Sequence, residues 1–351
     1  MTTESNFVMT GHPGAAEIRR LLNRNYRAWV KDVPLRIEFR GSAGGFSGAL
    51  FWQIEISGQS WCLRRWPAGG AAQASGLRWQ HRMLNQIQQA GFNRIPVPLT
   101  SDAGETLVSA GGAWWQLEPW LSGELARAAE IDANRFKSAI EAMADFHQAS
   151  SHCSIGAGSL PALRGRLAAF DRWWQRGQPS PEFRRLMQLA AADSRLAGLA
   201  PILESGFVRL ADEVISRLRP WSRGSWETRV VHGDLWSDHV LFCGDEVSGL
   251  VDFGALKRDH VSLDFARLRG SLAGDCERLR RIFLAHYRGR GGFSDQALEL
   301  ADGYEQSATL LTGLNWLSWI CVENRQFAAM EPVLARIQAI TRRMETLVNN
   351  G

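Results

Sequence analysis

Lysine is nearly absent from this chain of 351 residues. Lys31, Lys137 and Lys257 are the only lysines, so arginine supplies almost all of the positive charge, and the formal net charge is +4. The arginines do not form a stripe with interleaved aromatic residues, which a nucleic-acid-binding surface would require. We therefore expect no nucleic-acid partner.

Paired cysteines and long apolar runs are also missing. The five cysteines are scattered and show no CxxC spacing, which argues against a zinc site and favours a reduced compartment. Residues 1–11 are polar and lack the apolar segment of a signal peptide. No apolar run approaches the length that crosses a membrane. These features predict a cytoplasmic protein without a membrane partner, and they leave its oligomeric state open.

The periodicity of apolar residues changes along the chain. A helical pattern over residues 15–30 is followed by alternating, β-type patterns at 35–39, 52–56 and 61–64. A helix is predicted at 77–90 and a strand at 114–121. From residue 132 the chain is mostly helical, with helices expected at 163–176, 182–203 and 207–218 and in the C-terminal section. The sequence therefore predicts an α+β protein in which a β-rich part precedes a helical part.

This order divides the chain into three predicted parts. Residues 1–34 form an N-terminal tail and helix, residues 35–121 a β-rich lobe, and residues 122–351 a helical lobe. We expect the nucleotide-binding groups in the second part, and the catalytic loop and acceptor site in the third.

Two aspartates follow short predicted strands within residues 229–252. The run 229–231 leads into His232-Gly233-Asp234, and a predicted hairpin of strands at 240–242 and 247–251 ends at Asp252. The hairpin brings both carboxylates to one edge. Phosphoryl transfer from a metal–nucleotide complex needs such a pair, because one acid orients or deprotonates the acceptor hydroxyl and the other holds Mg²⁺ on the phosphates.

Three motifs in fixed order resemble those of a known family. His232-Gly233-Asp234-Leu235, Val251-Asp252-Phe253 and Leu263-Asp264-Phe265-Ala266 are similar to motifs of the aminoglycoside phosphotransferase and choline kinase-like family. That family is a branch of the protein-kinase-like fold, and the resemblance covers most of residues 39–269. It implies a two-lobed fold, with a small antiparallel β-sheet N-lobe and a larger, mostly helical C-lobe. MgATP would bind between the lobes.

The same resemblance assigns roles to the acids of the helical lobe. Asp234 takes the position of the catalytic base, and Asp252 that of the metal ligand. Asp264 takes the position of the acid that braces the loop. His232 belongs to the catalytic set, and its ring is expected to bond to the backbone near Asp252.

The β-rich lobe carries the predicted nucleotide-binding residues. The segment 41–48 resembles the family's phosphate loop, and its Gly44, Gly45 and Ser47 would contact phosphate through the backbone. The segment 114–120, with Glu118, resembles the hinge that receives adenine.

The family's phosphate-binding lysine is replaced in this chain. Its position falls on Arg64, which is permanently charged and can bind phosphate through two N–H groups. The helical acid that pairs with the lysine in the family falls here on Gln80 or His81, neither of which is anionic. Either residue could bond to Arg64 or simply lie at the surface.

A further departure lies at the second metal-binding position, which holds His239 where the family has asparagine. Mg²⁺ prefers oxygen ligands, whereas Mn²⁺ accepts imidazole more readily. Four interpretations stay open: His239 binds metal, Asp238 replaces it, Asp252 alone holds a single ion, or His239 only orients Asp234.

The resemblance thus implies an ATP-dependent kinase that phosphorylates a hydroxyl of a small molecule, with Mg²⁺ as cofactor and Mn²⁺ as the alternative metal. The alternative is a pseudokinase that binds nucleotide as a sensor or scaffold. In the family, helical insertions such as residues 151–228 form a wall of the acceptor site. This insertion is not strongly acidic, as a pocket for polycationic aminoglycosides should be. The sequence does not identify the acceptor, nor does it distinguish ATP from GTP.

Overall fold

The computed structural model describes residues 12–41, 48–67, 69–125, 131–153, 156–291, 293–327 and 329–350. Most of the predicted N-terminal tail lies outside these ranges. The chain divides into two compact units. Unit 1 comprises Met1–Gly123 with Ser248–Val251, and unit 2 comprises Glu124–Val247 with Asp252–Gly351. Within the described ranges, no helix combines the length and apolarity needed to span a membrane.

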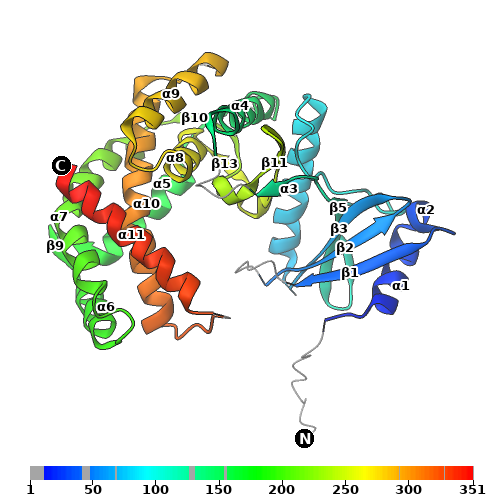
Figure 1. Ribbon diagram of the computed structural model, residues 1–351, viewed down its shortest axis with the longest axis horizontal. Coiled ribbons are helices and arrows are strands. Elements are labelled where there is room, and N and C mark those ends of the chain that lie inside the picture. Colours follow the sequence, from blue (N-terminus) through cyan, green and yellow to red (C-terminus); the bar gives the residue numbers. More distant parts are fainter. Residues whose placement is uncertain are drawn as a thin grey trace, which may run out of the picture. The chain divides into compact units, whose positions relative to one another are not determined.

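Unit 1 is built on a five-stranded antiparallel sheet in the order β1-β2-β3-β5-β4 (Figure 1). The hairpin between β2 and β3 turns at Ser57 and Gly58, both with positive φ, as a two-residue hairpin turn requires. The elements of this unit are α1 (Ala15–Asn25), α2 (Arg27–Val30), β1 (Leu35–Gly41), β2 (Leu50–Ile56), β3 (Gln59–Trp66), α3 (Ala71–Gln89), β4 (Val108–Ala110) and β5 (Ala113–Pro119).

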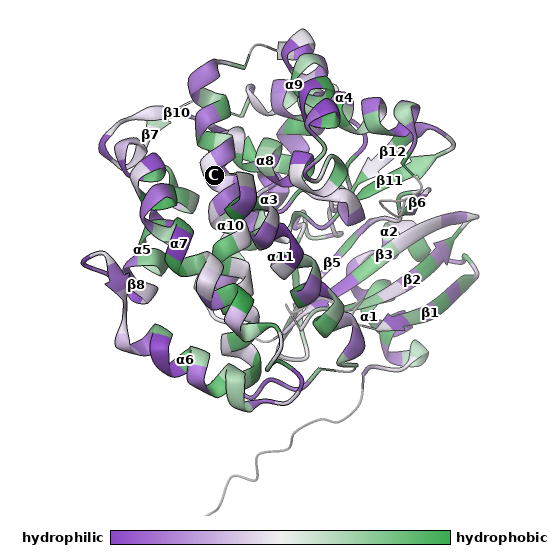
Figure 2. Cartoon of the chain, turned by 60° about the vertical axis from the view of Figure 1, so that its left-hand side comes forward, coloured by the Kyte–Doolittle hydropathy of each residue, from purple (hydrophilic) through white to green (hydrophobic). Residues whose placement is uncertain are grey.

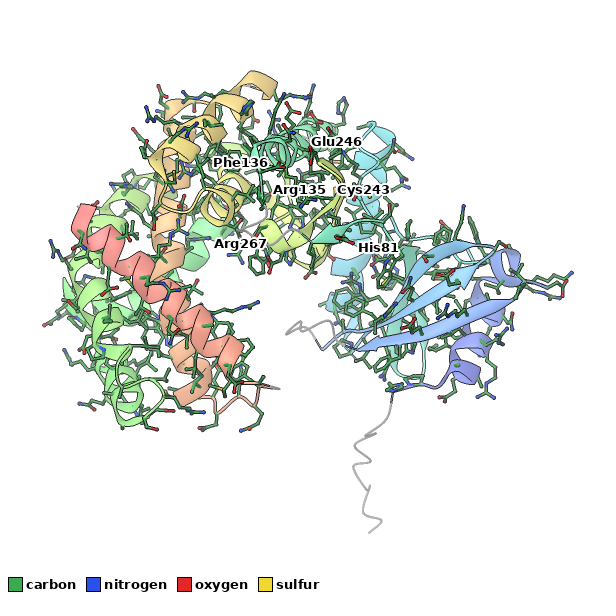
Figure 3. The ribbon with its side chains drawn as sticks, in the orientation of Figure 1. His81, Arg135, Phe136, Cys243, Glu246 and Arg267 are labelled. Atoms are coloured by element: carbon green, nitrogen blue, oxygen red, sulfur yellow. The ribbon has the colours of Figure 1, made fainter. Side chains whose placement is uncertain are left out.

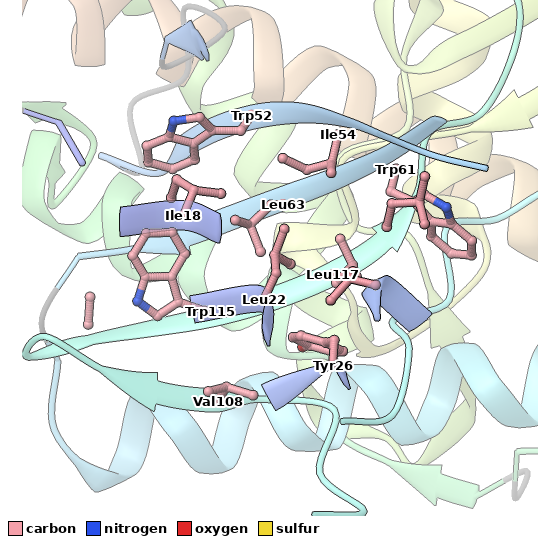
Figure 4. Packing of buried hydrophobic residues seen from close by; sticks show 13 residues of the cluster. Ile18, Leu22, Tyr26, Trp52, Ile54, Trp61, Leu63, Val108, Trp115 and Leu117 are labelled. Atoms are coloured by element: carbon pink, nitrogen blue, oxygen red, sulfur yellow. The ribbon is translucent and has the colours of Figure 1, made fainter. Parts of the chain in front are cut away.

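Alternation along the strands decides which side chains face which helix. Trp52, Ile54 and Leu63 pack with Leu22 and Tyr26 of the N-terminal helices in one core cluster (Figure 4). The opposite face of the sheet carries a second cluster, in which Ala49 and Trp66 pack against Ala74 and Leu77 of α3. Because side chains alternate with period two, Arg64 lies on the same face as Trp66. The sheet thus presents Arg64 on the α3 side.

Unit 2 is mainly helical, and its helices α5, α6 and α7 carry both polar and apolar surfaces (Figure 2). Its helices are α4 (Ala133–Ser150), α5 (Pro161–Trp173), α6 (Pro181–Ala192), α7 (Ala200–Leu218), α8 (Ser262–Leu272), α9 (Glu277–Gly291), α10 (Asp295–Cys321) and α11 (Glu331–Asn350), with short 3₁₀ segments η2 (Arg219–Arg223), η3 (Ser237–His239) and η4 (Phe253–Ala255).

Short strands supply the rest of this part of the chain. They form sheets in the orders β13-β10-β7 and β12-β11-β6 and a β8–β9 hairpin. The strands are β6 (Glu124–Leu125), β7 (Gly156–Gly158), β8 (Trp174–Gln175), β9 (Gln178–Pro179), β10 (Trp226–Val231), β11 (Val240–Cys243), β12 (Glu246–Leu250), which continues into unit 1, and β13 (Lys257–Asp259).

Helix α4 fixes the β11–β12 hairpin. Its N-terminus is capped by Asp132, whose carboxylate accepts from the backbone N–H groups of Asn134 and Arg135 at 3.0 and 2.9 Å. The Nε–H of Arg135 then donates to the carbonyl of Gly244 in the hairpin turn, at 2.9 Å. Figure 3 shows Arg135 on α4 near Cys243 and Glu246 of the hairpin. This contact positions the strand that leads to Asp252.

One predicted helix boundary is wrong. We expected a continuous helix over residues 182–203 and a break before Phe207, but the chain breaks between α6 and α7, at residues 193–199. Pro201 explains the shift, because proline is tolerated in the first turn of a helix and not in its interior. Gly206 does not end the helix. It allows close packing, since a Cβ there would lie 2.2 Å from Cγ of Met344.

Candidate active site

The loop after β10 carries Asp234 and passes very close to the backbone of the segment that follows Asp252. Gly233 has φ +82°, and a Cβ at this position would lie 2.3 Å from the carbonyl oxygen of Ala255. Only glycine allows the loop to pass this close to the segment after Asp252. The Asp234 side chain is about one-third exposed, so its carboxylate is open to a bound molecule.

Asp264 holds this loop from α8. The side chain is fully buried and accepts hydrogen bonds from the backbone N–H groups of His232, at 2.7 Å, and Gly233, at 2.8 Å. Nε2 of His147 lies 3.1 Å from the same carboxylate, and Nδ1 of His147 lies 2.7 Å from the hydroxyl of Tyr287. Burial by itself raises the pKa of Asp264, but these donors and the nearby histidine charges outweigh it and lower the pKa. The bracing position assigned to Asp264 thus corresponds to direct bonds to the loop.

Asp252 has left-handed backbone geometry, with φ 61° and ψ 59°. Such a conformation costs a non-glycine residue about 1–3 kcal/mol, and strain of this kind concentrates at functional sites. Its carboxylate is roughly half exposed, and Oδ2 lies 3.6 Å from Nε2 of His239. Asp252 therefore presents an accessible carboxylate next to an imidazole.

His239 connects the two aspartates. Its Nδ1 lies 2.7 Å from the backbone carbonyl oxygen of Asp234 and must carry the proton, because a carbonyl only accepts. Nε2 is then the acceptor atom and receives the indole N–H of Trp236 at 3.1 Å. The ring thus fixes the Asp234 peptide, and its Nε2, which accepts from Trp236, lies beside the carboxylate of Asp252. The ring of His232 stacks with that of His239 at 5.7 Å.

These groups suit a divalent cation that also binds phosphates. Among the described residues no group of three or more His, Cys, Asp or Glu side chains could hold a metal. Mg²⁺ commonly uses one or two carboxylates and completes its shell with water and substrate phosphates. Asp252 fits that pattern. Nε2 of His239 could ligate the ion only by giving up the bond from Trp236, and Mn²⁺ would tolerate the imidazole better than Mg²⁺. Asp238 is exposed and accepts a bond from the hydroxyl of its neighbour Ser237.

Arg267 is a site residue that sequence reasoning missed. It lies one turn after Asp264 on α8 (Figure 3), and its guanidinium forms an ion pair with the carboxylate of Asp234. Helical spacing was the available signal, because residues i and i+3 lie on one face of a helix. The predicted base is thus neutralised by an arginine in this structure.

In unit 1 the predicted nucleotide-binding residues Arg64 and Glu118 pair with each other at 3.0 Å. Their strands are in register so that Arg64 lies opposite Gln116, which makes Glu118 its diagonal neighbour. Both side chains are nearly buried. The acid partner of the arginine thus comes from β5, and not from the helix that supplies it in the resembled family. Gly44, Gly45 and Ser47 lie outside the described residues.

His81 is buried and belongs to the hydrogen-bond network behind this pair. Its ring nitrogens lie 2.8 Å from the hydroxyl of Thr106 and 3.1 Å from the amide oxygen of Gln116. The amide nitrogen of Gln116 donates to Glu118. Burial lowers the pKa of His81 from 6.5 to about 4, against the raising effect of the bond to Gln116.

We expect this histidine to make stability depend on pH. Between pH 6.5 and 4 the unfolded chain gains a proton at His81 and the folded protein does not. Stability therefore falls as the pH falls, by up to roughly 3 kcal/mol from this group. Urea unfolding of the wild type and of His81→Gln across pH 7.5 to 4 measures this, with exposed His12→Gln as the control. An unchanged pH slope in His81→Gln would contradict the assignment.

Residues 38–300, more than half of the chain, match the family described as "Phosphotransferase enzyme family" (APH). The chain belongs to this family. It is 27% identical over 184 residues to a homoserine kinase of Allorhizobium ampelinum, a match that covers 52% of this chain and 49% of that protein. The chain spans about half the length of the curated relatives that it first matches.

Solved structures share the fold. Spectinomycin phosphotransferase in complex with ADP and spectinomycin has a TM-score of 0.67 at 10% identity, covering 95% of this chain and 98% of that one. An amicoumacin kinase in complex with AMP-PNP and Ca²⁺ has a TM-score of 0.58 at 12% identity, covering 95% and 96%. The predicted fold class, an antiparallel β-sheet part with a mostly helical part in the protein-kinase-like fold, is confirmed.

Proposed function

We propose that this protein is a kinase that transfers the γ-phosphoryl group of ATP to a hydroxyl of a small molecule. The observation that carries the proposal is the geometry around His239. One ring nitrogen bonds to the backbone of Asp234, and the other lies 3.6 Å from Asp252. One side chain thus bonds to the backbone of the candidate base and lies beside the candidate metal ligand, in a chain of the phosphotransferase family.

In this proposal Asp234 accepts the proton of the acceptor hydroxyl. The acceptor oxygen bonds to the γ-phosphorus while the bond from that phosphorus to the bridging oxygen of ADP breaks. Asp252, with or without His239, would hold the divalent cation, which neutralises charge on the phosphates. Arg64 is proposed to contact phosphate, with Glu118 fixing its guanidinium. Positioning and electrostatic stabilisation supply most of the rate enhancement in such a transfer.

Binding of a nucleotide tests the proposal first. Calorimetric titration with a non-hydrolysable ATP analogue should show binding that Mg²⁺ or Mn²⁺ strengthens. In Asp252→Ala we expect the metal-dependent part to fall about 10- to 100-fold, the range for lost contacts to a charged group.

Two further variants sharpen this titration. Asp238→Ala asks whether the neighbouring acid is the ligand, and Glu204→Ala, at an exposed position on α7, is the surface control. Absence of binding with every metal would overturn the kinase proposal.

A nucleotide-binding protein without transferase activity is the second candidate. The ion pair between Arg267 and Asp234 favours it, because it occupies the carboxylate that the transfer needs. The two candidates differ in whether any hydroxyl compound is phosphorylated.

A further inference from the structure

A cavity of about 330 Å³ lies beside the Asp234 loop, within unit 2. Trp236, two residues after Asp234, and Arg267, which pairs with Asp234, both line it. The remaining walls come from α5, α8, α10 and α11. Its volume is at the lower end of the range for small-molecule sites. Asp234 itself does not line the cavity, but its ion-pair partner Arg267 does. If Asp234 is the base, as proposed above, a hydroxyl at the Arg267 end of the cavity would approach it.

The lining of this cavity is cationic. Arg166, Arg267 and Arg343 line it, and among the described residues Glu305 is the only acid that does so. The charge of Glu305 is already shared: Nη1 of Arg280 lies 2.6 Å away, Nη2 of Arg269 lies 2.7 Å away, and Arg343 forms a further ion pair with it. Glu305 is therefore paired with other arginines and forms no ion pair with Arg166.

Among the arginines that line the cavity, Arg166 is the best candidate to bind an anionic ligand. Its guanidinium lies over the ring of Tyr304 at 4.6 Å, and Nη1 donates to the carbonyl of Ala162 at 3.3 Å. No carboxylate of the described residues forms an ion pair with it. The buried acid Asp259 acts on it electrostatically, yet accepts its own bonds from the N–H groups of Ala162 and His260.

A guanidinium has five N–H donors, and one bond to a carbonyl leaves most of them available. Arg166 is only partly exposed, and burial lowers its pKa. Partial burial of a cation that has no ion-pair partner costs free energy, and a bound anion would lower that cost. Apolar Leu263, Ala266 and Ile340 line the same cavity, so the bound molecule also meets a hydrocarbon surface.

We propose that the acceptor is a small organic anion: a hydroxyl for Asp234, a short apolar skeleton, and a carboxylate or phosphate group bound by Arg166. This inference rests on the proposed kinase function for the hydroxyl, but the anion site stands on its own contacts. It separates this chain from relatives whose acceptors are polycations.

Four compounds with one skeleton test the charge preference: 4-hydroxybutyrate, 4-hydroxybutyl phosphate, 1,4-butanediol and 4-aminobutan-1-ol. The same four end groups on a hydroxymethylbenzene skeleton form a second set. Binding to the full chain is measured by calorimetry without nucleotide, and phosphorylation is measured separately with MgATP. We expect the anionic members to bind at least about tenfold more tightly than the neutral and cationic ones. Comparing the carboxylate compound with the phosphate compound of each set shows which anionic group the protein prefers.

Arg166→Gln should weaken binding of the anionic compounds about 10- to 100-fold and leave the neutral diols unaffected. Arg166→Lys should restore part of the affinity, since it keeps the charge without the fork geometry. Arg172→Gln, on the exposed side of the same helix, is the matched control, and thermal unfolding checks that each variant is folded.

The outcomes separate this inference from the proposed function. Phosphorylation of neutral or cationic compounds alone overturns the anionic acceptor and leaves the kinase intact. Anion binding that depends on Arg166, without phosphorylation of any compound, supports the site and overturns the kinase. Failure of every anionic probe to bind at millimolar concentration, or equal binding in Arg166→Gln, overturns the inference.

Discussion

Replacing Asp234 by asparagine should abolish phosphoryl transfer while nucleotide binding is retained. Asparagine matches aspartate in shape, but it cannot take a proton from the acceptor hydroxyl. Loss of a positioned general base costs about 10²- to 10⁴-fold in kcat. The measurement is steady-state transfer to the hydroxyl compound that the matched panel identifies, together with calorimetric binding of the ATP analogue.

The ion pair with Arg267 makes this prediction sharper. In Asp234→Asn the guanidinium loses its carboxylate, but it is 39% exposed and water can solvate it. Exposed ion pairs contribute about 0–1 kcal/mol, so the variant should fold nearly as stably as the wild type. A large loss of kcat with unchanged unfolding therefore separates a chemical role of Asp234 from a structural one.

Glu204→Gln is the control, because it removes a negative charge from an exposed side chain on α7, outside the candidate site. We expect its kcat to stay within about threefold of the wild type, since a substitution away from special contacts changes little. Equal turnover in Asp234→Asn and the wild type would rule out Asp234 as the base. A protein with no turnover in either form, but with intact nucleotide binding, would be the pseudokinase.

Local patterns in the sequence were sufficient to predict the fold class and most elements. Alternation predicted β2 and β3, because a half-buried strand exposes every second side chain, and Ser57 and Gly58 form the turn between them. The bounds of α6 and α7 were not predictable in the same way. There a proline's position within the turn, and a glycine packed against Met344, decide where the helix breaks.

The site shows the same division between local and distant signals. The family resemblance gave Asp264 the position of the acid that braces the loop, and its carboxylate accepts from the N–H groups of His232 and Gly233. The pairing of Arg64 with Glu118 depends on the register of β3 and β5, which lie 54 residues apart at this point. Spacing along one helix could not reveal it. Arg267 meets Asp234 because α8 returns to the loop, and its position three residues after Asp264 on that helix was the available local signal.

Replacing Asp264 by alanine should destabilise the protein and also free the loop that carries Asp234. The side chain is fully buried and accepts from three donors: the N–H groups of His232 and Gly233, and the His147 ring. In Asp264→Ala these donors lose their acceptor inside the protein. Breaking a buried charged network of this kind costs about 3–5 kcal/mol. Urea unfolding at pH 7 measures the loss, with exposed Asp171→Asn on α5 as the control.

The pH dependence of stability gives this second prediction an independent readout. The folded protein holds the pKa of Asp264 below its ordinary value of 3.8, so its contribution is present above pH 3.8 and is lost as the pH falls through the folded pKa. Asp264→Ala should therefore lose stability at pH 7 and show a shallower decline at acidic pH. Because the freed loop no longer fixes Asp234, kcat should fall more than nucleotide affinity. If the free energy of unfolding of this variant at pH 7, and its decline at acidic pH, both equal those of the wild type, Asp264 does not hold the loop.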